Sequence, residues 1–133
     1  MKLSMTLLSA MLLWGHSVFA DATKVQTVIQ SQLEAIQSDN FSEAFEFAAP
    51  NIRMIFQSAD RFGQMVRGGY PMVYRNRSVT YGKYSEDSQF SSQIVNLESL
   101  DGSVFQLRYD LVETPEGWKI QGVQILGRSS VGA

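Results

Sequence analysis

The chain has 133 residues, no cysteine, one histidine and a formal net charge of −2 at pH 7. The histidine is His16, in an N-terminal segment that we expect to be removed, so what remains has neither imidazole nor thiol. These absences exclude Ser-His-Asp and Cys-His nucleophile systems and the zinc and copper sites that need such ligands, and the acidic balance argues against nucleic-acid binding.

Residues 1–20 have the pattern of a secretory signal peptide. Lys2 precedes a mostly apolar run over residues 3–14, and Ala20 ends the segment as a signal peptidase requires. A run this short does not span a bilayer, which takes roughly 20 apolar residues. The sequence therefore predicts export and cleavage after Ala20 or Ala22, giving a periplasmic or secreted protein with no membrane attachment after cleavage.

Residues 21–133 are predicted to form a single domain that opens with helices. The first covers residues 23–38, because apolar residues recur there every three or four positions: Val25, Val28, Ile29, Leu33 and Ile36. A short helix over residues 41–48 follows, and Pro50 is expected to end it.

Two further helical segments are predicted before the sheet. Residues 51–57 form one short turn of helix, with Ile52, Ile55 and Phe56 buried. Ser58 caps a helix over residues 59–67, which Gly68 and Gly69 stop, and Pro71 is expected to prevent a restart.

From about residue 72 the apolar period changes from helical to two, which indicates strands. Strands are predicted over residues 77–85, 89–98 and 104–112, with turns at Asp101-Gly102 and Pro115-Glu116-Gly117. The third strand alternates clearly, with Phe105, Leu107, Tyr109 and Leu111 on its inner face.

The fourth strand changes phase in its middle. Trp118 and Ile120 have one parity, and Val123 and Ile125 have the other, so a bulge at Gly122 would return all four to one face. Residues 127–133 are expected to fray. Helices followed by four strands with tight turns predict an α+β domain, in which helices cover one face of an antiparallel sheet.

Three segments carry a resemblance to a known family: VIQSQLEAIQSDNFSEAFEFAAPNI, MVRGGYPMVYRNRSV and LRYDLVETPEGWKIQGVQI. Over about residues 24–126 the chain resembles the exported bacterial proteins of domain of unknown function 4864, and more broadly the nuclear transport factor 2-like superfamily. The resemblance implies a cone of helices packed into a curved four-stranded sheet. It implies no activity and no catalytic residue.

A basic block is the main candidate for a binding site. Residues 51–83 carry six basic side chains and one acidic one. Their most compact part surrounds a Gly-Gly-Tyr-Pro turn, where guanidinium groups and aromatic walls would bind an anionic or amphipathic small molecule. The candidate ligand-binding residues are Arg67, Tyr70, Tyr74, Arg75 and Arg77. The alternative is a solvated basic rim that pairs with the acidic helices.

Two other functions stay open. A pocket enzyme of isomerase or dehydratase type would use Asp and Tyr, with Asp110 near Arg108 and Tyr109, but alternation places Asp110 on the outer face, where it would pair with Arg108. An interaction module would dimerise or bind a partner through the outer sheet face. The sequence favours a non-enzymatic ligand-binding domain and predicts no cofactor and no metal site.

Overall fold

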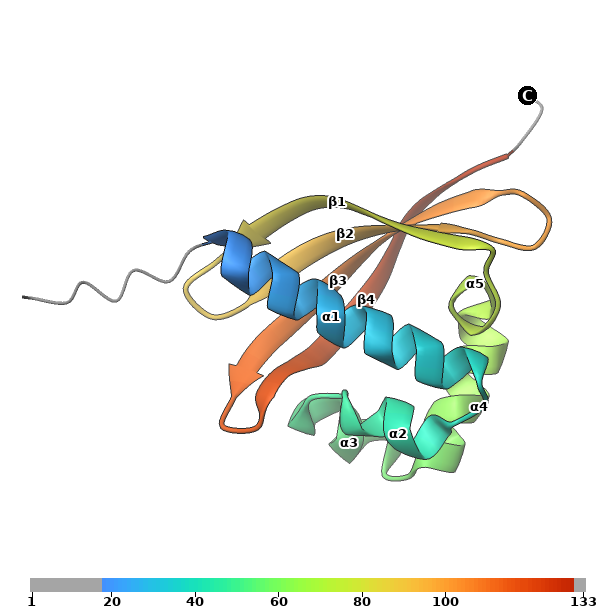
Figure 1. The fold of residues 1–133 in the computed structure, drawn as a ribbon. Coiled ribbons are helices and arrows are strands. Elements are labelled where there is room, and N and C mark those ends of the chain that lie inside the picture. The colour runs from blue at the N-terminus through green and yellow to red at the C-terminus, as the bar shows by residue number, and fades with distance from the viewer. Residues whose placement is uncertain (1–17, 131–133) are drawn as a thin grey trace, which may run out of the picture.

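The computed structural model describes residues 18–130, and these form helices followed by one antiparallel sheet. The predicted signal peptide lies mostly outside the described residues. Figure 1 shows the longest helix, α1, running across one face of the sheet, with the shorter helices gathered beside it. The α+β prediction is therefore confirmed. No described helix is long and apolar enough to cross a membrane.

The helical half has one long helix and four short ones. Their bounds are α1 Val18–Gln37, α2 Phe41–Glu46, α3 Pro50–Phe56, α4 Ala59–Gly69 and α5 Pro71–Tyr74. Helix α1 begins earlier than predicted and crosses the expected cleavage position. The side chains of Asn40 and Ser58 cap α2 and α4 by accepting from the backbone N–H three residues on.

Both prolines act in the opposite sense to the prediction. Pro50 begins α3 and Pro71 begins α5. The N–H groups of the first helical turn have no acceptor within the helix, so proline, which lacks an N–H, breaks no hydrogen bond there. Helix α4 also continues through Gly68 and Gly69, and the N–H of Tyr70 donates to the carbonyl of Val66 at its end. The chain thus passes from α4 to α5 with only Tyr70 between them.

The sheet has the order β1-β2-β3-β4, and each strand is antiparallel to its neighbour. The bounds are β1 Ser78–Glu86, β2 Ser91–Glu98, β3 Val104–Thr114 and β4 Gly117–Ser129. Strand β4 therefore includes residues 127–129, so the predicted fraying of this segment is wrong. Gly102 and Gly117 have positive φ in the two turns that flank β3, a conformation in which glycine has no Cβ penalty.

The predicted bulge in β4 is confirmed. Leu111 pairs with Ile120 and Asp110 pairs with Gly122, so Gln121 is the extra residue. A second irregularity at Leu126 separates Gly127 from Ile125. The first bulge keeps Ile120 and Val123 on the face that carries Leu111 and Tyr109, which is the face covered by the helices.

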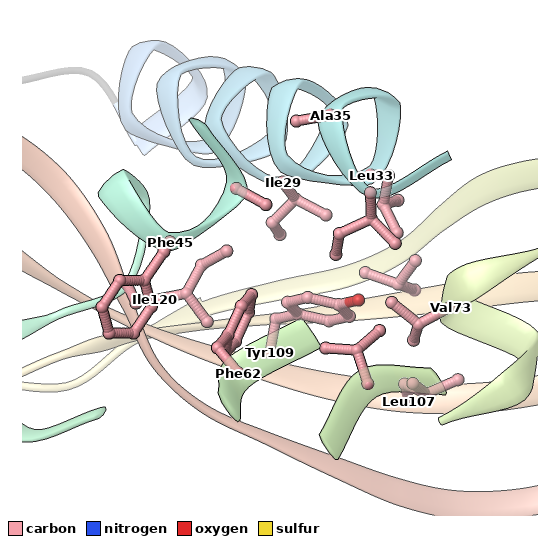
Figure 2. Packing of buried hydrophobic residues seen from close by; sticks show 14 of the residues in the cluster. Ile29, Leu33, Ala35, Phe45, Phe62, Val73, Leu107, Tyr109 and Ile120 are labelled. Carbon is pink, nitrogen blue, oxygen red and sulfur yellow. The ribbon is translucent and has the colours of Figure 1, made fainter. Parts of the chain in front are cut away.

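The core lies between α1 and this inner face of the sheet (Figure 2). Leu107, Tyr109 and Ile120 are buried in one cluster with Ile29, Leu33 and Phe45, as the alternation predicts. Trp118 is only partly buried at its edge. A correction concerns α3, where three residues were expected to be buried: Ile55 is 67% exposed, and Ile52 and Phe56 are only partly buried.

Candidate functional site

A cavity of about 330 Å³ lies between the inner face of the sheet and the helices α1, α3 and α4. This volume is at the lower end of the range for ligand pockets, about 300–1,000 Å³. The lining is mainly aliphatic and aromatic, and no charged side chain contributes to it. Six of its members come from the five elements α1, α4, α5, β3 and β4: Ile36, Val66, Val73, Tyr109, Ile120 and Val123.

Three polar side chains line the cavity, and two of them have partners within the protein. The amide of Gln32 donates to the carbonyl of Ala44 at 3.2 Å. The hydroxyl of Tyr70 donates to the carbonyl of Val123 at 3.1 Å, which fixes the end of α4 against β4. The third is Tyr109, whose hydroxyl has no hydrogen-bond partner among the described residues.

Burial controls the ionisation of Tyr109. The residue is 0% exposed, and burial, followed by the nearby Tyr81 and Tyr70, raises the pKa of its phenol well above the ordinary value of 10.0. The hydroxyl is consequently neutral at all physiological pH values and can donate one hydrogen bond. Sequence alternation places Tyr109 on the inner face but does not distinguish a filled core from a cavity.

Helix α3 forms one wall of the cavity. Ile52, Ile55 and Phe56 contribute to the lining, yet α3 has no fully buried residue. Met54 is 76% exposed beside Ile55. The ends of α3 differ: the N–H of Ala49 donates to the carbonyl of Ile120 at 2.8 Å, whereas Gln57 ends the helix with a left-handed φ of 67°.

The structure brings three of the five predicted site residues together, but around a carboxylate of the protein itself. The hydroxyl of Tyr74 donates to Asp39 Oδ1 at 2.6 Å, and Arg75 Nη2 lies 3.2 Å from Asp39 Oδ2. Arg67 Nη2 lies 3.6 Å from Asp39 Oδ1. We call these four residues the Asp39 cluster; it joins the end of α1 to α4 and α5.

Aromatic rings add to this arrangement. The guanidinium carbon of Arg75 lies 3.8 Å from the ring centroid of Tyr74, and that of Arg67 lies 4.6 Å from the ring centroid of Phe41. The Tyr74 hydrogen bond, followed by Arg75 and Arg67, lowers the pKa of Asp39 below its ordinary 3.8. The cluster is exposed, and an anion from solution would have to compete with Asp39 for the two arginines.

The remaining two predicted site residues lie elsewhere. Tyr70 lines the apolar cavity, away from the Asp39 cluster. Arg77 is exposed beside the sheet, where its backbone N–H donates to the carbonyl of Glu98 at 2.7 Å. The cavity is therefore lined mainly by apolar residues, and Tyr70 is the one predicted site residue among them.

Asp110 lies on the outer face of the sheet. Its Oδ1 is 3.2 Å from Arg108 Nε and accepts from the hydroxyl of Ser92 at 2.7 Å. No carboxylate belongs to the described lining of the cavity. Within residues 18–130, no three His, Cys, Asp or Glu side chains are close enough together to hold a metal ion.

Comparison with known proteins gives one family and a shared fold. A model of the family described as Domain of unknown function (DUF4864) matches residues 18–133. No curated protein sequence matches the chain. The solution structure of a SEC-C motif containing protein from Rhodopseudomonas palustris is similar, with a TM-score of 0.56 and 13% identity over 83% of this chain and 87% of that one. This similarity shows the fold alone.

A second solved structure is a phospholipid-binding protein from Ralstonia solanacearum in complex with a phospholipid. It has a TM-score of 0.49 and 16% identity, and the match covers 79% of this chain and 77% of that chain.

Proposed function

This chain belongs to the DUF4864 family, and we propose that it binds a small, mainly apolar or amphipathic ligand in the cavity between its helices and its sheet. The observation that carries the proposal is the cavity of about 330 Å³ with an uncharged, largely apolar lining. Apolar pockets with a few polar groups are the usual form of small-molecule sites. We also assign the fold to the nuclear transport factor 2-like cone.

The size of the cavity limits the buried part of the ligand. Its volume equals that of about eleven water molecules at about 30 Å³ each, so the buried part has about ten to twelve non-hydrogen atoms. A charged group of an amphipathic ligand would lie outside the lining, because no basic side chain contributes to it. Entry past α3 places such a group at the surface.

Binding is better supported than catalysis. Proton transfer in such a pocket needs a carboxylate or another base within reach of the substrate. Asp110, the acid considered for this role, is paired with Arg108 on the outer face. An interaction module or a homodimer through that face stays a prediction, and its many polar side chains, among them Ser92, Asn96 and Gln106, give it little support.

A pair of valine variants tests the proposal. Val123 on β4 lines the cavity and Val79 on β1 does not, while both are partly buried strand residues at the edge of the core. Butylbenzene is a probe of suitable size. We expect two-dimensional NMR to show saturable shifts at cavity-lining residues, at least tenfold weaker binding in Val123→Phe, and unchanged binding in Val79→Phe.

The outcome that contradicts the proposal is equally clear. If Val123→Phe and Val79→Phe bind butylbenzene equally well, the cavity is not where this probe binds. If neither butylbenzene nor an oxygen-containing analogue of similar size causes saturable shifts in the folded protein, the proposal fails.

We further propose that the protein is exported and cleaved. The support is the pattern of residues 1–20, and over residues 21–37 of α1, where burial is described, the first buried side chain is Val25, beyond the cleavage position. Intact mass of the protein from an extracytoplasmic fraction should correspond to a chain that starts at Asp21 or Thr23. A mass that includes residues 1–20 would contradict this.

A further inference from the structure

The outer surface of α3 carries the two most exposed large apolar side chains of the described residues, Met54 at 76% and Ile55 at 67%. They are consecutive in a helix that contains no acidic side chain. Scattered apolar residues are common on protein surfaces, but adjacent ones beside a hollow mark a contact with another protein or with a membrane. The helical period predicted Ile55 to be buried, so only the structure shows this surface.

A second hollow, a groove of about 520 Å³, lies between α3 and the β3–β4 turn, which Figure 1 shows beside each other. Ile55 and Phe56 of α3 line the apolar cavity. Arg53 and Met54 line the groove, together with Lys119 of β4. Successive residues of a helix are about 100° apart, so these two pairs face opposite sides of α3. Met54 and Ile55 therefore form an exposed apolar ridge between the two hollows.

Two cationic groups of this groove have no acidic partner. Lys119 Nζ donates to the backbone carbonyl of Glu46 at 2.9 Å, and the guanidinium carbon of Arg53 lies 5.4 Å from the ring centroid of Phe45. Among the described residues neither cation forms an ion pair with a carboxylate, although Glu116 also lines the groove. Both positive charges are therefore available to anionic groups from outside the protein.

We propose that this α3 surface, formed by Arg53, Met54, Ile55 and Lys119, docks the protein on an anionic lipid bilayer. A bilayer presents anionic head groups directly above an apolar layer, which matches cations beside exposed apolar side chains. Met54 and Ile55 enter the boundary of the apolar layer, and the two cations contact the head groups. The contact is reversible, because a short helix on the surface binds far more weakly than a spanning helix.

This inference goes beyond the proposed function, because it concerns the outer surface of α3 and supplies a source of ligand. Ile55 belongs both to this surface and to the lining of the cavity, so an amphipathic molecule has a path between bilayer and cavity that avoids bulk water. The sequence predicted no membrane attachment after cleavage. Docking through α3 needs neither a spanning helix nor a lipid anchor, and it depends on an exposure of Ile55 that periodicity did not predict.

A fluorophore attached to a single introduced cysteine tests where the protein meets the bilayer, since the chain has no cysteine of its own. In the protein as isolated from cells, nitrobenzoxadiazole is attached to Met54→Cys or, as the control, to Leu100→Cys. Leu100 is also exposed, in the β2–β3 turn at the opposite end of the sheet. With vesicles of equal parts phosphatidylcholine and phosphatidylglycerol, we expect the emission of the label on Met54→Cys to rise and shift to the blue. The label on Leu100→Cys should not respond. Binding to vesicles of phosphatidylcholine alone should be about tenfold weaker or more.

Charge variants of the labelled Met54→Cys protein test the cations. Lys119→Gln should weaken binding to the mixed vesicles about fivefold, the contribution of one cation near an anionic bilayer. Lys83→Gln is the matched control, because Lys83 is exposed on β1, at the other edge of the sheet. This control should leave binding unchanged.

Several outcomes would overturn docking through α3. These are equal responses of the two labels, equal binding to the two kinds of vesicle, and equal binding by Lys119→Gln and Lys83→Gln. An emission change of the label on Met54→Cys when the protein is concentrated without vesicles would also overturn it, because a second copy of the chain then covers α3. The butylbenzene titration involves no bilayer, so ligand binding in the cavity and docking through α3 succeed or fail separately.

Discussion

The two halves of the inner sheet face differ in how they are covered. Under α1, Val25, Ile29 and Leu33 belong to the same closely packed cluster as Val95 and Leu97 of β2, and all five are buried. Under α3 the same sheet lines a cavity, and α3 has no buried residue. The half under α1 therefore contributes most of the packing that stabilises the fold, whereas the half under α3 is less closely packed and leaves the cavity.

This difference has a consequence for mutations. A side chain in the filled half is surrounded by other atoms, so its loss leaves a void that the structure fills only in part. A side chain at the mouth of the cavity has few protein neighbours, so its loss changes what the cavity can hold more than it changes folding. Stability and binding should thus respond to different residues.

The largest effect is expected at Leu107. This side chain is fully buried on β3, so Leu107→Ala should lower the free energy of unfolding by about 2–5 kcal/mol. Urea titration measures it. Leu100→Ala is the control, because Leu100 is exposed in the β2–β3 turn and should change stability by less than about 0.5 kcal/mol. A similar small effect at both positions would mean that the filled half is not the source of stability.

A smaller effect of opposite sign is expected at Tyr109. An unsatisfied buried hydroxyl costs about 1–3 kcal/mol, so Tyr109→Phe should raise the free energy of unfolding of the ligand-free protein by about 1 kcal/mol. Tyr81→Phe should lower it instead, since it loses the hydrogen bond that its hydroxyl shares between the carbonyl of Gln26 and Oε1 of Gln30. Destabilisation by Tyr109→Phe in the same urea titration would show that the hydroxyl is satisfied without ligand.

Ile55 tests the open half. Because this side chain is mostly exposed, Ile55→Ala should change stability by no more than about 0.5 kcal/mol. It should nevertheless weaken butylbenzene binding severalfold, since Ile55 lines the cavity. Ile125→Ala removes the same atoms from a partly exposed strand position outside the lining and should leave binding unchanged. Equal binding by the two variants would remove α3 from the site.

The smallest effect is expected at Asp39, which joins the end of α1 to α4 and α5. The Tyr74 hydrogen bond is the main cause that lowers the pKa of Asp39 in the folded protein below its ordinary 3.8. Ionised Asp39 therefore adds to the free energy of unfolding above about pH 3.8, and this stabilisation is lost as the pH falls through the lower folded-state pKa. Asp39→Asn keeps a residue that tolerates its left-handed φ of 56°. Below about pH 4, the urea concentration at the unfolding midpoint should therefore fall less steeply with decreasing pH in the variant than in the wild type. Parallel midpoints from pH 7 to 3 would contradict this.

Periodicity made most of the fold predictable. The helical spacing from Val25 to Ile36 and the alternation from Leu107 to Leu111 each identify a buried face, and the phase change near Gly122 locates the bulge. The prolines were misread because proline ends one helix and starts the next by the same property, the missing N–H. Which of the two applies depends on the following residues.

The candidate site was harder to predict for a different reason. Apolar residues that line a cavity have the same pattern as those that fill a core, so nothing distinguishes Val66 or Val123 in one sequence. The basic block did indicate convergence of Arg67 and Arg75, but their partner Asp39 lies 36 positions before Arg75. A contact across that separation depends on how the helices pack.

The bulges in β4 set where this strand can change length. Successive side chains of a regular strand point to opposite faces of the sheet. Removing one residue, such as Lys119 or Gln124, would therefore move every side chain beyond the deletion to the other face. Gln121 and Leu126 are extra residues opposite β3, and deleting either one would restore regular alternation and keep Ile120, Val123 and Ile125 facing inward. Single-residue insertions and deletions among relatives are therefore expected to concentrate at these two positions of β4.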